Sequence, residues 1–459
     1  MSPRDTPTLL QRALWAGGWT IAGQGAGQLI RLAGNLIMTR LLVPEMFGVM
    51  AIATMVTVVL WLLSDLGIRQ NIVQSDRGED AAFLDTAWVI QITRGWVQWL
   101  AALILSLALY LANAAYWLPA DSVYVAPVLP WVIAVVSLTA VIQGFQSTKM
   151  AVAHRHLNQK RIIQVELISQ VAGLAVMVVL GLATRSIWAL VAGALVASLT
   201  TTLLSHLCMS GHSDRFRVEK KALQELSQFG KWVFASSAIG TMAANGDRLL
   251  LGFFANSHTL GLYAIAALIV GAIEGVANRL FATVSLPMLS TTARVDRENL
   301  REVYYKIRIP LDLALLFLCG LLISAGQLII DALYDDRYAA SGGMLQILAF
   351  SLFAVRLGVA HQLYLAIARP RYLMLVSVTR AISLYAMTPM LYFLYGTEAC
   401  IWGIALHGIT VVPLTYYFNA KLKLNDFGRE LKVLAALPVG YLCGGAIKFL
   451  CGLLTAAPT

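Results

Sequence analysis

The chain has little charge for its length. Lys, Arg, Asp and Glu together make up 13% of its 459 residues, which is about half of the roughly 25% that is usual in a soluble domain. So little charge cannot cover a water-facing surface of this size. Polar linkers of the kind that join soluble domains are also missing, so the composition excludes a string of soluble domains.

Motifs for metals and reactive thiols are missing as well. The seven histidines show no HExxH or other ligand spacing, so no metal site is predicted, and no cofactor is expected. The five cysteines form no CxxC pair, and they lie in or at the ends of apolar runs, as small core residues do. They are Cys208, Cys319, Cys400, Cys443 and Cys451.

Long apolar runs are what the sequence does have. Hydrophobic residues make up 59% of the chain, and apolar runs of about 20 residues, each long enough to cross a hydrocarbon core of about 30 Å, follow one another. The alternation of a membrane β-barrel is absent, so the spans are expected to be helices. We expect thirteen of them: 13–41, 46–68, 82–113, 125–150, 159–184, 186–208, 229–254, 258–286, 302–330, 342–368, 372–395, 398–420 and 430–454.

The basic residues are distributed unevenly over the predicted loops. The first span follows a polar segment and lacks a small-residue cleavage site, so it is expected to be retained. With a cytoplasmic N-terminus, the inside loops hold 24 of the 34 Lys and Arg residues, and the outside loops hold only Arg40, Arg185 and Arg337. This asymmetry predicts a cytoplasmic N-terminus. The net charge of +10 therefore indicates topology and attraction to anionic lipid, not binding of nucleic acid.

Two halves of the chain resemble each other. The stretch FGVMAIA at 47–53 returns as LGLYAIA at 260–266, MAVAHRH at 150–156 returns as LAIARPR at 365–371, and Ile-Trp at 187–188 returns at 401–402. The three offsets agree to within two residues, and each pair falls at the same place in a unit of six spans. Because six is even, both halves enter the membrane in the same orientation, which is the arrangement of parallel-repeat transporters.

The first span carries a polar stripe. Gln24, Gln28, Arg31 and Asn35 are spaced by four, three and four residues, so they share one face of a helix. Arginine near the middle of a span costs on the order of 2.5–3.5 kcal/mol when it faces lipid, so this face is expected to meet protein or a wet cavity. The seventh span, its counterpart in the repeat, carries a similar stripe with Thr241, Asn245 and Arg248.

Further charges lie at membrane depth, and basic groups outnumber acidic ones. The basic groups are Arg94, Arg279, Arg356 and Arg380, and the acidic ones are Asp247 and Glu274. This bias predicts a cavity that holds an anion, and guanidinium groups fit phosphate or pyrophosphate because they donate in pairs. The alternative for each arginine is a structural ion pair, such as Arg279 with Glu274 or Arg248 with Asp247.

Several motifs resemble a known family. They are TRLLVPEMFG at 39–48, Ser64 to Gly67, Ile72 to Gln74, Phe229-Gly230, Asp247 to Gly252 and LGLYA at 260–264. Over nearly its whole length the chain resembles the Wzx-type flippases of the multidrug/oligosaccharidyl-lipid/polysaccharide superfamily, most of all the branch that serves exopolysaccharides such as colanic acid or succinoglycan. Close relatives often have fourteen spans, so residues 430–459 could hold one span or a broken pair.

The resemblance implies an all-α polytopic membrane protein of the bacterial inner membrane, not an enzyme. Two pseudo-symmetric six-helix lobes, 1–208 and 229–421, would surround a central cavity, with a cytoplasmic linker at 209–228 and an additional segment at 422–459. The implied cargo is an undecaprenyl-pyrophosphate-linked oligosaccharide, moved among membrane lipids, and the implied partners are a polysaccharide polymerase and co-polymerase. Arg31 would bind the headgroup, followed by Arg279 and Arg356, while Asp247 and Glu274 are the carboxylates available for ion coupling.

Other functions fit parts of these observations. A multidrug extruder of the same superfamily would favour acidic residues in the cavity, and a lipid II-type flippase would differ in cargo but not in mechanism. A membrane glycosyltransferase or polymerase would need a sizeable outside loop with acid/base residues, whereas the longest one here, DALYDDRYAAS at 331–341, is short. A duplicated scaffold that transports nothing is the remaining alternative.

Overall fold

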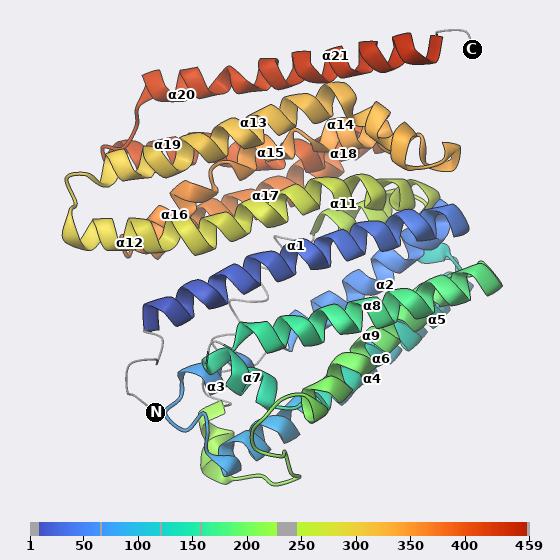
Figure 1. The fold of residues 1–459 in the computed structure, drawn as a ribbon. Helices are drawn as coiled ribbons and strands as arrows, with labels where there is room; N and C mark the ends of the chain where they lie inside the picture. Colours follow the sequence, from blue (N-terminus) through green and yellow to red (C-terminus); the bar gives the residue numbers. More distant parts are fainter. Residues whose placement is uncertain (1–8, 65–66, 120–121, 157, 227–245, 457–459) are drawn as a thin grey trace. The chain divides into compact units, whose positions relative to one another are not determined.

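The computed structural model describes residues 9–64, 67–119, 122–156, 158–226 and 246–456, and every regular element in this part of the chain is helical (Figure 1). The predicted all-α fold class is confirmed. The chain divides into two compact units, Met1–Met242 and Ala243–Thr459. The finer boundaries expected at 208, 228 and 421 stay a prediction.

Unit 1 consists of long spans with short helices between them. Its elements are α1 (Leu9–Leu41), α2 (Pro44–Leu63), α3 (Ile68–Gln74), α4 (Ala81–Ala114), η1 (Val123–Val125), α5 (Leu129–Val136), α6 (Leu138–Gly144), α7 (Lys149–Arg155), α8 (Gln159–Thr184) and α9 (Trp188–Leu207).

Glycines set how α1 packs within unit 1. A methyl group at Gly34 would meet the side chain of Leu174 on α8 at 2.8 Å, and one at Gly27 would meet that of Gln170 at 3.2 Å. Small residues allow the close approach on which helix pairs in membranes depend. The glycine face of α1 therefore packs on α8, which runs beside it in Figure 1.

The predicted fourth span is broken. Its axis bends by 65° between 129–144 and 149–155. Gln91 on α4 donates its amide N–H groups to three carbonyl groups near the break, those of Gln143, Gly144 and Gln146, at 3.0, 3.2 and 3.0 Å. These bonds satisfy backbone groups that the break removes from the helix, as irregular backbone at membrane depth requires.

The segment that follows α9 docks on unit 1. The buried carboxylate of Asp85 on α4 accepts a hydrogen bond from the backbone N–H of Arg215 at 2.9 Å and contacts Nε2 of His212 at 2.7 Å. Further along, Glu219 pairs with Arg77 at 2.6 Å. The described part of the expected linker, residues 209–226, is thus bound to the unit that precedes it.

Unit 2 contains a helical segment at 246–254 and a larger number of broken helices. Its other elements are α11 (Ser257–Leu280), η2 (Phe281–Ser285), α12 (Leu286–Val295), α13 (Leu300–Leu333), η3 (Asp336–Tyr338), α14 (Ser341–Leu348), α15 (Ser351–Val355), α16 (Gly358–Ala366), α17 (Pro370–Tyr395), α18 (Thr397–Leu406), η4 (His407–Thr410), α19 (Val411–Lys421), α20 (Phe427–Leu434) and α21 (Ala436–Ala456).

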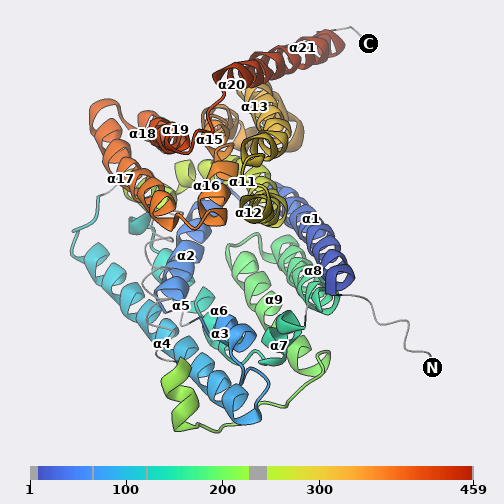
Figure 2. The same ribbon diagram turned by 90° about the vertical axis from the view of Figure 1, so that its left-hand side faces the viewer.

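The last helix of unit 2 lies along α13, as Figure 2 shows at the end of the chain. Gly440 of α21 faces the backbone of Phe317, and a methyl group at Gly444 would meet the carbonyl oxygen of Leu321 at 2.9 Å. Residues 427–451 count as one candidate span. The segment expected at 430–454 therefore corresponds to one candidate span, made of α20 and α21.

The expected spans agree with the apolar helices. Among the described residues, ten helices are long and apolar enough to cross a membrane, or eleven if the bent fourth span is included. Each coincides with one of the thirteen expected. Of the other two, the first forms α1, and most of the seventh, 229–254, lies outside the described residues.

Candidate functional site

The polar stripe of α1 forms the first group of candidate ligands. Arg31 and Gln24 are exposed, and Gln28 and Asn35 are half-buried. The guanidinium of Arg31 donates to the side-chain oxygen of Gln28 from Nε at 3.1 Å and from Nη2 at 2.6 Å. No ion pair involves Arg31 in the part of the chain that the structure describes, so its positive charge is not neutralised there.

The packing of α1 leaves this stripe accessible within unit 1. Gly27 and Gly34 face α8, and Gln24 and Arg31 lie outside that contact. A methyl group at Gly25, next to Gln24, would meet no described atom within 4 Å. Helix α1 therefore has two distinct faces. The face with small residues packs on α8, and the polar face does not.

A second polar group lines a cavity of about 220 Å³ in unit 1, between α2, α3, α4 and α6. Arg94 stands over the ring of Trp61 at 5.4 Å from its centre. Gln98 is buried and donates to the hydroxyl of Ser64. Arg94, predicted from its position in the third span, thus reaches a cavity whose other polar groups are mostly amides.

Unit 2 brings three of the predicted residues together. Asp247, Glu274 and Arg380 line one cavity of about 160 Å³. The hydroxyl of Tyr263 donates to Asp247 at 2.5 Å, and that of Ser351 donates to Glu274 at 2.9 Å. Two carboxylates therefore sit within one cavity, each held by a single neutral hydroxyl.

The basic side of this cavity comes from α17 and from the helical segment 246–254. Arg380 donates from Nε to Nε2 of His407 at 3.3 Å, and Arg248 also lines the cavity. The alternative in which Asp247 and Arg248 form a structural ion pair finds no such pair among the described residues. The cavity carries as many carboxylates as guanidinium groups, so a cation or a proton can bind without leaving a large excess of charge.

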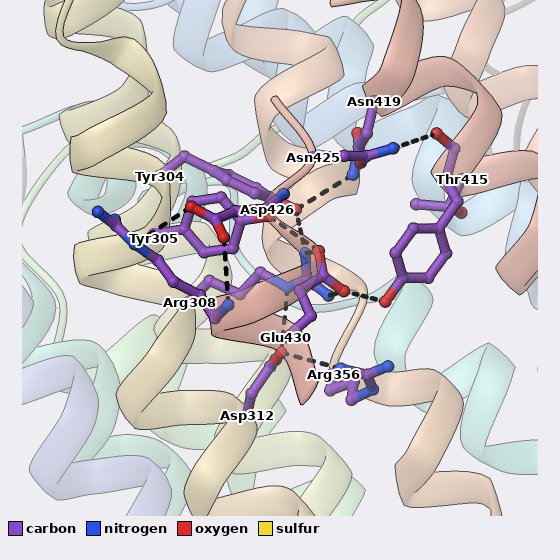
Figure 3. A network of polar contacts seen from close by, with 12 residues as sticks. Tyr304, Tyr305, Arg308, Asp312, Arg356, Thr415, Asn419, Asn425, Asp426 and Glu430 are labelled. Atoms are coloured by element: carbon purple, nitrogen blue, oxygen red, sulfur yellow. Dashed lines mark hydrogen bonds and ion pairs between the residues drawn. The ribbon is translucent and has the colours of Figure 1, made fainter. Parts of the chain in front are cut away.

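Arg356, by contrast, is buried in a polar network at another place in unit 2 (Figure 3). Its Nη1 pairs with Asp312 at 3.1 Å, and the same carboxylate oxygen accepts from Nε of Arg308 at 3.0 Å. Arg356 is only 2% exposed. In this conformation its guanidinium joins the end of α15 to α13, and none of the cavities described above includes it.

Glu430 completes the network from α20. It accepts from Nη1 and Nη2 of Arg308 at 2.8 and 3.1 Å, and the hydroxyls of Tyr305 and Tyr416 also donate to it. The four buried charges, two arginines and two carboxylates, balance one another. Buried charges are tolerated when they are paired and hydrogen-bonded in this way.

The remaining predicted residues divide in two. Arg279 is half-buried in the last turn of α11 and is not among the residues that line the described cavities. Thr241 and Asn245 lie outside the described residues. The described residues contain no group of three or more His, Cys, Asp or Glu side chains that could hold a metal ion.

Several residues that contact the predicted ones were not predicted from the sequence. Tyr263, Ser351 and His407 complete the unit 2 cavity, and hydroxyls inside apolar spans give no signal of their own. Asp312 could have been found, because it stands four residues after Arg308 on one helix face. Glu430 could not, since it bonds Arg308 across 122 residues.

The sequence matches a known protein family. The model of the family described as "polysaccharide biosynthesis protein" matches residues 37–342, more than half of the chain. No curated protein matches it in sequence.

Three solved structures are similar in fold. The lipid II flippase MurJ in an inward closed conformation has a TM-score of 0.70 at 13% identity, over 97% of this chain and 94% of that one. An inward-facing multidrug resistance MATE family transporter of the MOP superfamily has a TM-score of 0.62 at 13% identity, over 94% and 96%. A MOP superfamily transporter from Pyrococcus furiosus, described by the reverse polarity of its binding pocket, has 0.55 at 13% identity, over 89% and 95%. At such identities the likeness concerns the fold.

Proposed function

The chain belongs to the family of polysaccharide biosynthesis proteins, and on that premise we propose that it flips a lipid-linked oligosaccharide. The cargo is an undecaprenyl-pyrophosphate-linked repeat unit, carried across the bacterial inner membrane by alternating access for exopolysaccharide or surface polysaccharide export. The proposal assigns transport and no covalent step. The fold shared with flippases and transporters supports it.

The observation that carries the proposal is the state of Arg31. Its guanidinium is exposed, bonds the amide of Gln28 and meets no carboxylate among the described residues. A guanidinium fork matches two oxygens of a phosphate, and a pyrophosphate offers several. We assign the headgroup to the α1 stripe, with Gln24, Gln28 and Asn35 donating beside Arg31.

Other basic groups have weaker support as ligands. Arg94 and Arg380 line cavities and stay candidates. Arg279, Thr241 and Asn245 stay predictions of the sequence. Arg356 could contact the cargo only in a conformation that separates it from Asp312, because the two groups are paired and buried.

We assign ion coupling to the cavity of Asp247 and Glu274. Each carboxylate accepts from one neutral hydroxyl, so each keeps acceptor capacity for a proton or a cation. Loss or gain of that charge would change the attraction to Arg248 and Arg380 in the same cavity. Such a change would shift the equilibrium between the conformations of unit 2.

The distribution of basic residues over the loops supports one orientation in the membrane. Because the Lys and Arg residues concentrate in alternate loops, we place the N-terminus in the cytoplasm of the cell. Release of the cargo on the far side would supply a polysaccharide polymerase and its co-polymerase, which are the partners that this assignment implies.

An export assay in cells tests the proposal. Arg31→Ala is expected to lower polymer output at least tenfold while lipid-linked repeat units accumulate, since a hydrogen bond to a charged group contributes about 1.5–3 kcal/mol. Arg185→Ala, which removes an exposed arginine between α8 and α9, is the matched control and should export normally. Normal export by Arg31→Ala, at equal abundance in the membrane, would remove Arg31 from the headgroup site.

A further inference from the structure

A third cavity lies in unit 2, where α11, α14 and α18 begin and the later part of α13 passes them. Its volume is about 640 Å³, compared with about 220 and 160 Å³ for the two cavities described above. Sites for small organic molecules usually enclose about 300–1,000 Å³. None of the residues assigned to the headgroup or to ion coupling lines this cavity.

The wall combines aromatic rings with polar groups. Trp402 and Phe350 lie with their ring centres 5.2 Å apart at an angle of 50°, and Met344 and Ile401 add apolar surface. Gln346 and Glu398 line the same space. Among the described residues no hydrogen bond engages the Gln346 amide, the Glu398 carboxylate or the indole N–H of Trp402, so these groups are available to a ligand.

Such a wall suits an occupant with both an apolar face and hydroxyl groups. A hydrocarbon chain would cover the rings but would form no hydrogen bond with the Gln346 amide or the Glu398 carboxylate. A small inorganic ion would use neither the rings nor most of the volume. A sugar ring satisfies both requirements, because its C–H face packs on an aromatic ring and its hydroxyls donate and accept.

We propose that this cavity is a saccharide-binding subsite, in which a sugar ring of the cargo packs on Trp402 and Phe350 and bonds Gln346 and Glu398. The inference rests on the proposed function, since it names where the glycan part of the cargo binds. With the N-terminus in the cytoplasm, as proposed above from the loop charges, this end of the helices lies outside the cytoplasm. The sugar would therefore occupy the subsite after it has crossed, which favours export over return.

Single substitutions can either fill the subsite or remove its binding groups. A methyl group at Gly343 on α14 meets no described atom within 4 Å, so Gly343→Leu places a side chain into open space of the cavity wall. Trp402→Ala removes the larger ring, and Glu398→Gln removes only the charge of an exposed side chain. Trp188, which occupies the corresponding Ile-Trp position of the first half, is 42% exposed, and Trp188→Ala is the matched control.

The test is sugar binding by the full-length protein in lipid nanodiscs. Glucose, galactose, N-acetylglucosamine and glucuronic acid are each titrated and followed by saturation-transfer NMR. We expect at least one of them to bind with a dissociation constant in the millimolar range. Trp402→Ala and Gly343→Leu should each weaken that binding at least tenfold, Glu398→Gln about threefold, and Trp188→Ala should leave it unchanged.

Three results would overturn the subsite. They are the absence of binding for all four sugars, binding that survives both Trp402→Ala and Gly343→Leu, and displacement of the bound sugar from the wild type by farnesol, which would show that the cavity prefers a hydrocarbon chain. Elution as a single peak on size exclusion confirms that each variant is folded. The proposed function is judged apart, by export from Arg31→Ala: loss of that export together with absent sugar binding overturns the subsite alone.

Discussion

Two buried arginines and one exposed arginine in this chain lie in opposite surroundings. Arg308 and Arg356 are 1% and 2% exposed, and both bond the carboxylate of Asp312. Arg31 is exposed, and among the described residues its hydrogen-bond partner is the neutral amide oxygen of Gln28, one turn earlier on α1. An arginine matched by a buried carboxylate contributes to structure, whereas one that meets only amides keeps its charge for an anion. Charge at membrane depth therefore identifies a ligand only after its partners are known.

The largest expected effect is a loss of stability when the buried network around Arg308 is broken. Glu430→Gln leaves Arg308 buried without its charged bidentate partner, and breaking a buried pair costs about 3–5 kcal/mol. We expect a clear fall in the unfolding temperature of the purified protein in detergent, measured by intrinsic fluorescence. Glu302→Gln, which breaks the exposed pair with Arg429, is the control. Equal unfolding temperatures for the two variants would show that the buried network does not stabilise unit 2.

Arg31 should give the opposite result. Arg31→Lys keeps the charge but loses the planar fork, so we expect polymer output between that of the wild type and that of Arg31→Ala, several-fold below the wild type. The unfolding temperature should not change, because the side chain is exposed and holds no buried partner. A fall in unfolding temperature as large as that of Glu430→Gln would show that Arg31 has a structural role, like Arg308 and Arg356.

The next largest effect is expected from replacing the carboxylates of the unit 2 cavity. Glu274→Gln and Asp247→Asn keep the hydroxyl contacts of Ser351 and Tyr263 but can no longer bind a proton or cation by charge. We expect each to slow gradient-driven flipping in proteoliposomes about tenfold, while flipping without a gradient continues at the wild-type rate. Asp331→Asn, at an exposed position on α13, is the control. Equal losses with and without a gradient would argue against a coupling role.

The smallest expected effect comes from an exposed pair. The hydrogen bond from Arg77 lowers the pKa of Asp80 below its ordinary value of 3.8. Because the folded state lowers this pKa, the contribution of Asp80 is present above that value and is lost as the pH falls through the folded pKa. Asp80→Asn should flatten the loss of stability below about pH 4, measured as unfolding temperature against pH, and change little at pH 7. A large change at pH 7 would show that this exposed pair is not weak.

The spans were predictable because a helix that crosses lipid needs a continuous run of apolar residues. Each of the ten candidate spans, and the bent fourth one, coincides with an expected helix. The bend itself was not predictable, because the groups that stabilise it come from another helix: Gln91 on α4 bonds the carbonyls near Gly144. Hydropathy records which residues avoid water and says nothing of such partners.

The candidate site was predictable in part for the same reason. The stripe of α1 follows from spacing alone, and Arg31 is exposed within unit 1 as the stripe requires. Arg356 looked equally suitable as a headgroup ligand in the sequence. Its charge is matched, however, by Asp312, which lies 44 residues earlier in the chain on α13. Helical spacing shows which residues share a face, but not what lies opposite that face.

Direct binding of the headgroup tests the central claim most closely. Undecaprenyl pyrophosphate is titrated into the purified protein in nanodiscs, and binding to the wild type is compared with binding to Arg31→Ala. We predict that the wild type binds and that Arg31→Ala binds at least tenfold more weakly with an unchanged unfolding temperature. Equal affinity of the two proteins would contradict the assignment of Arg31 to the headgroup.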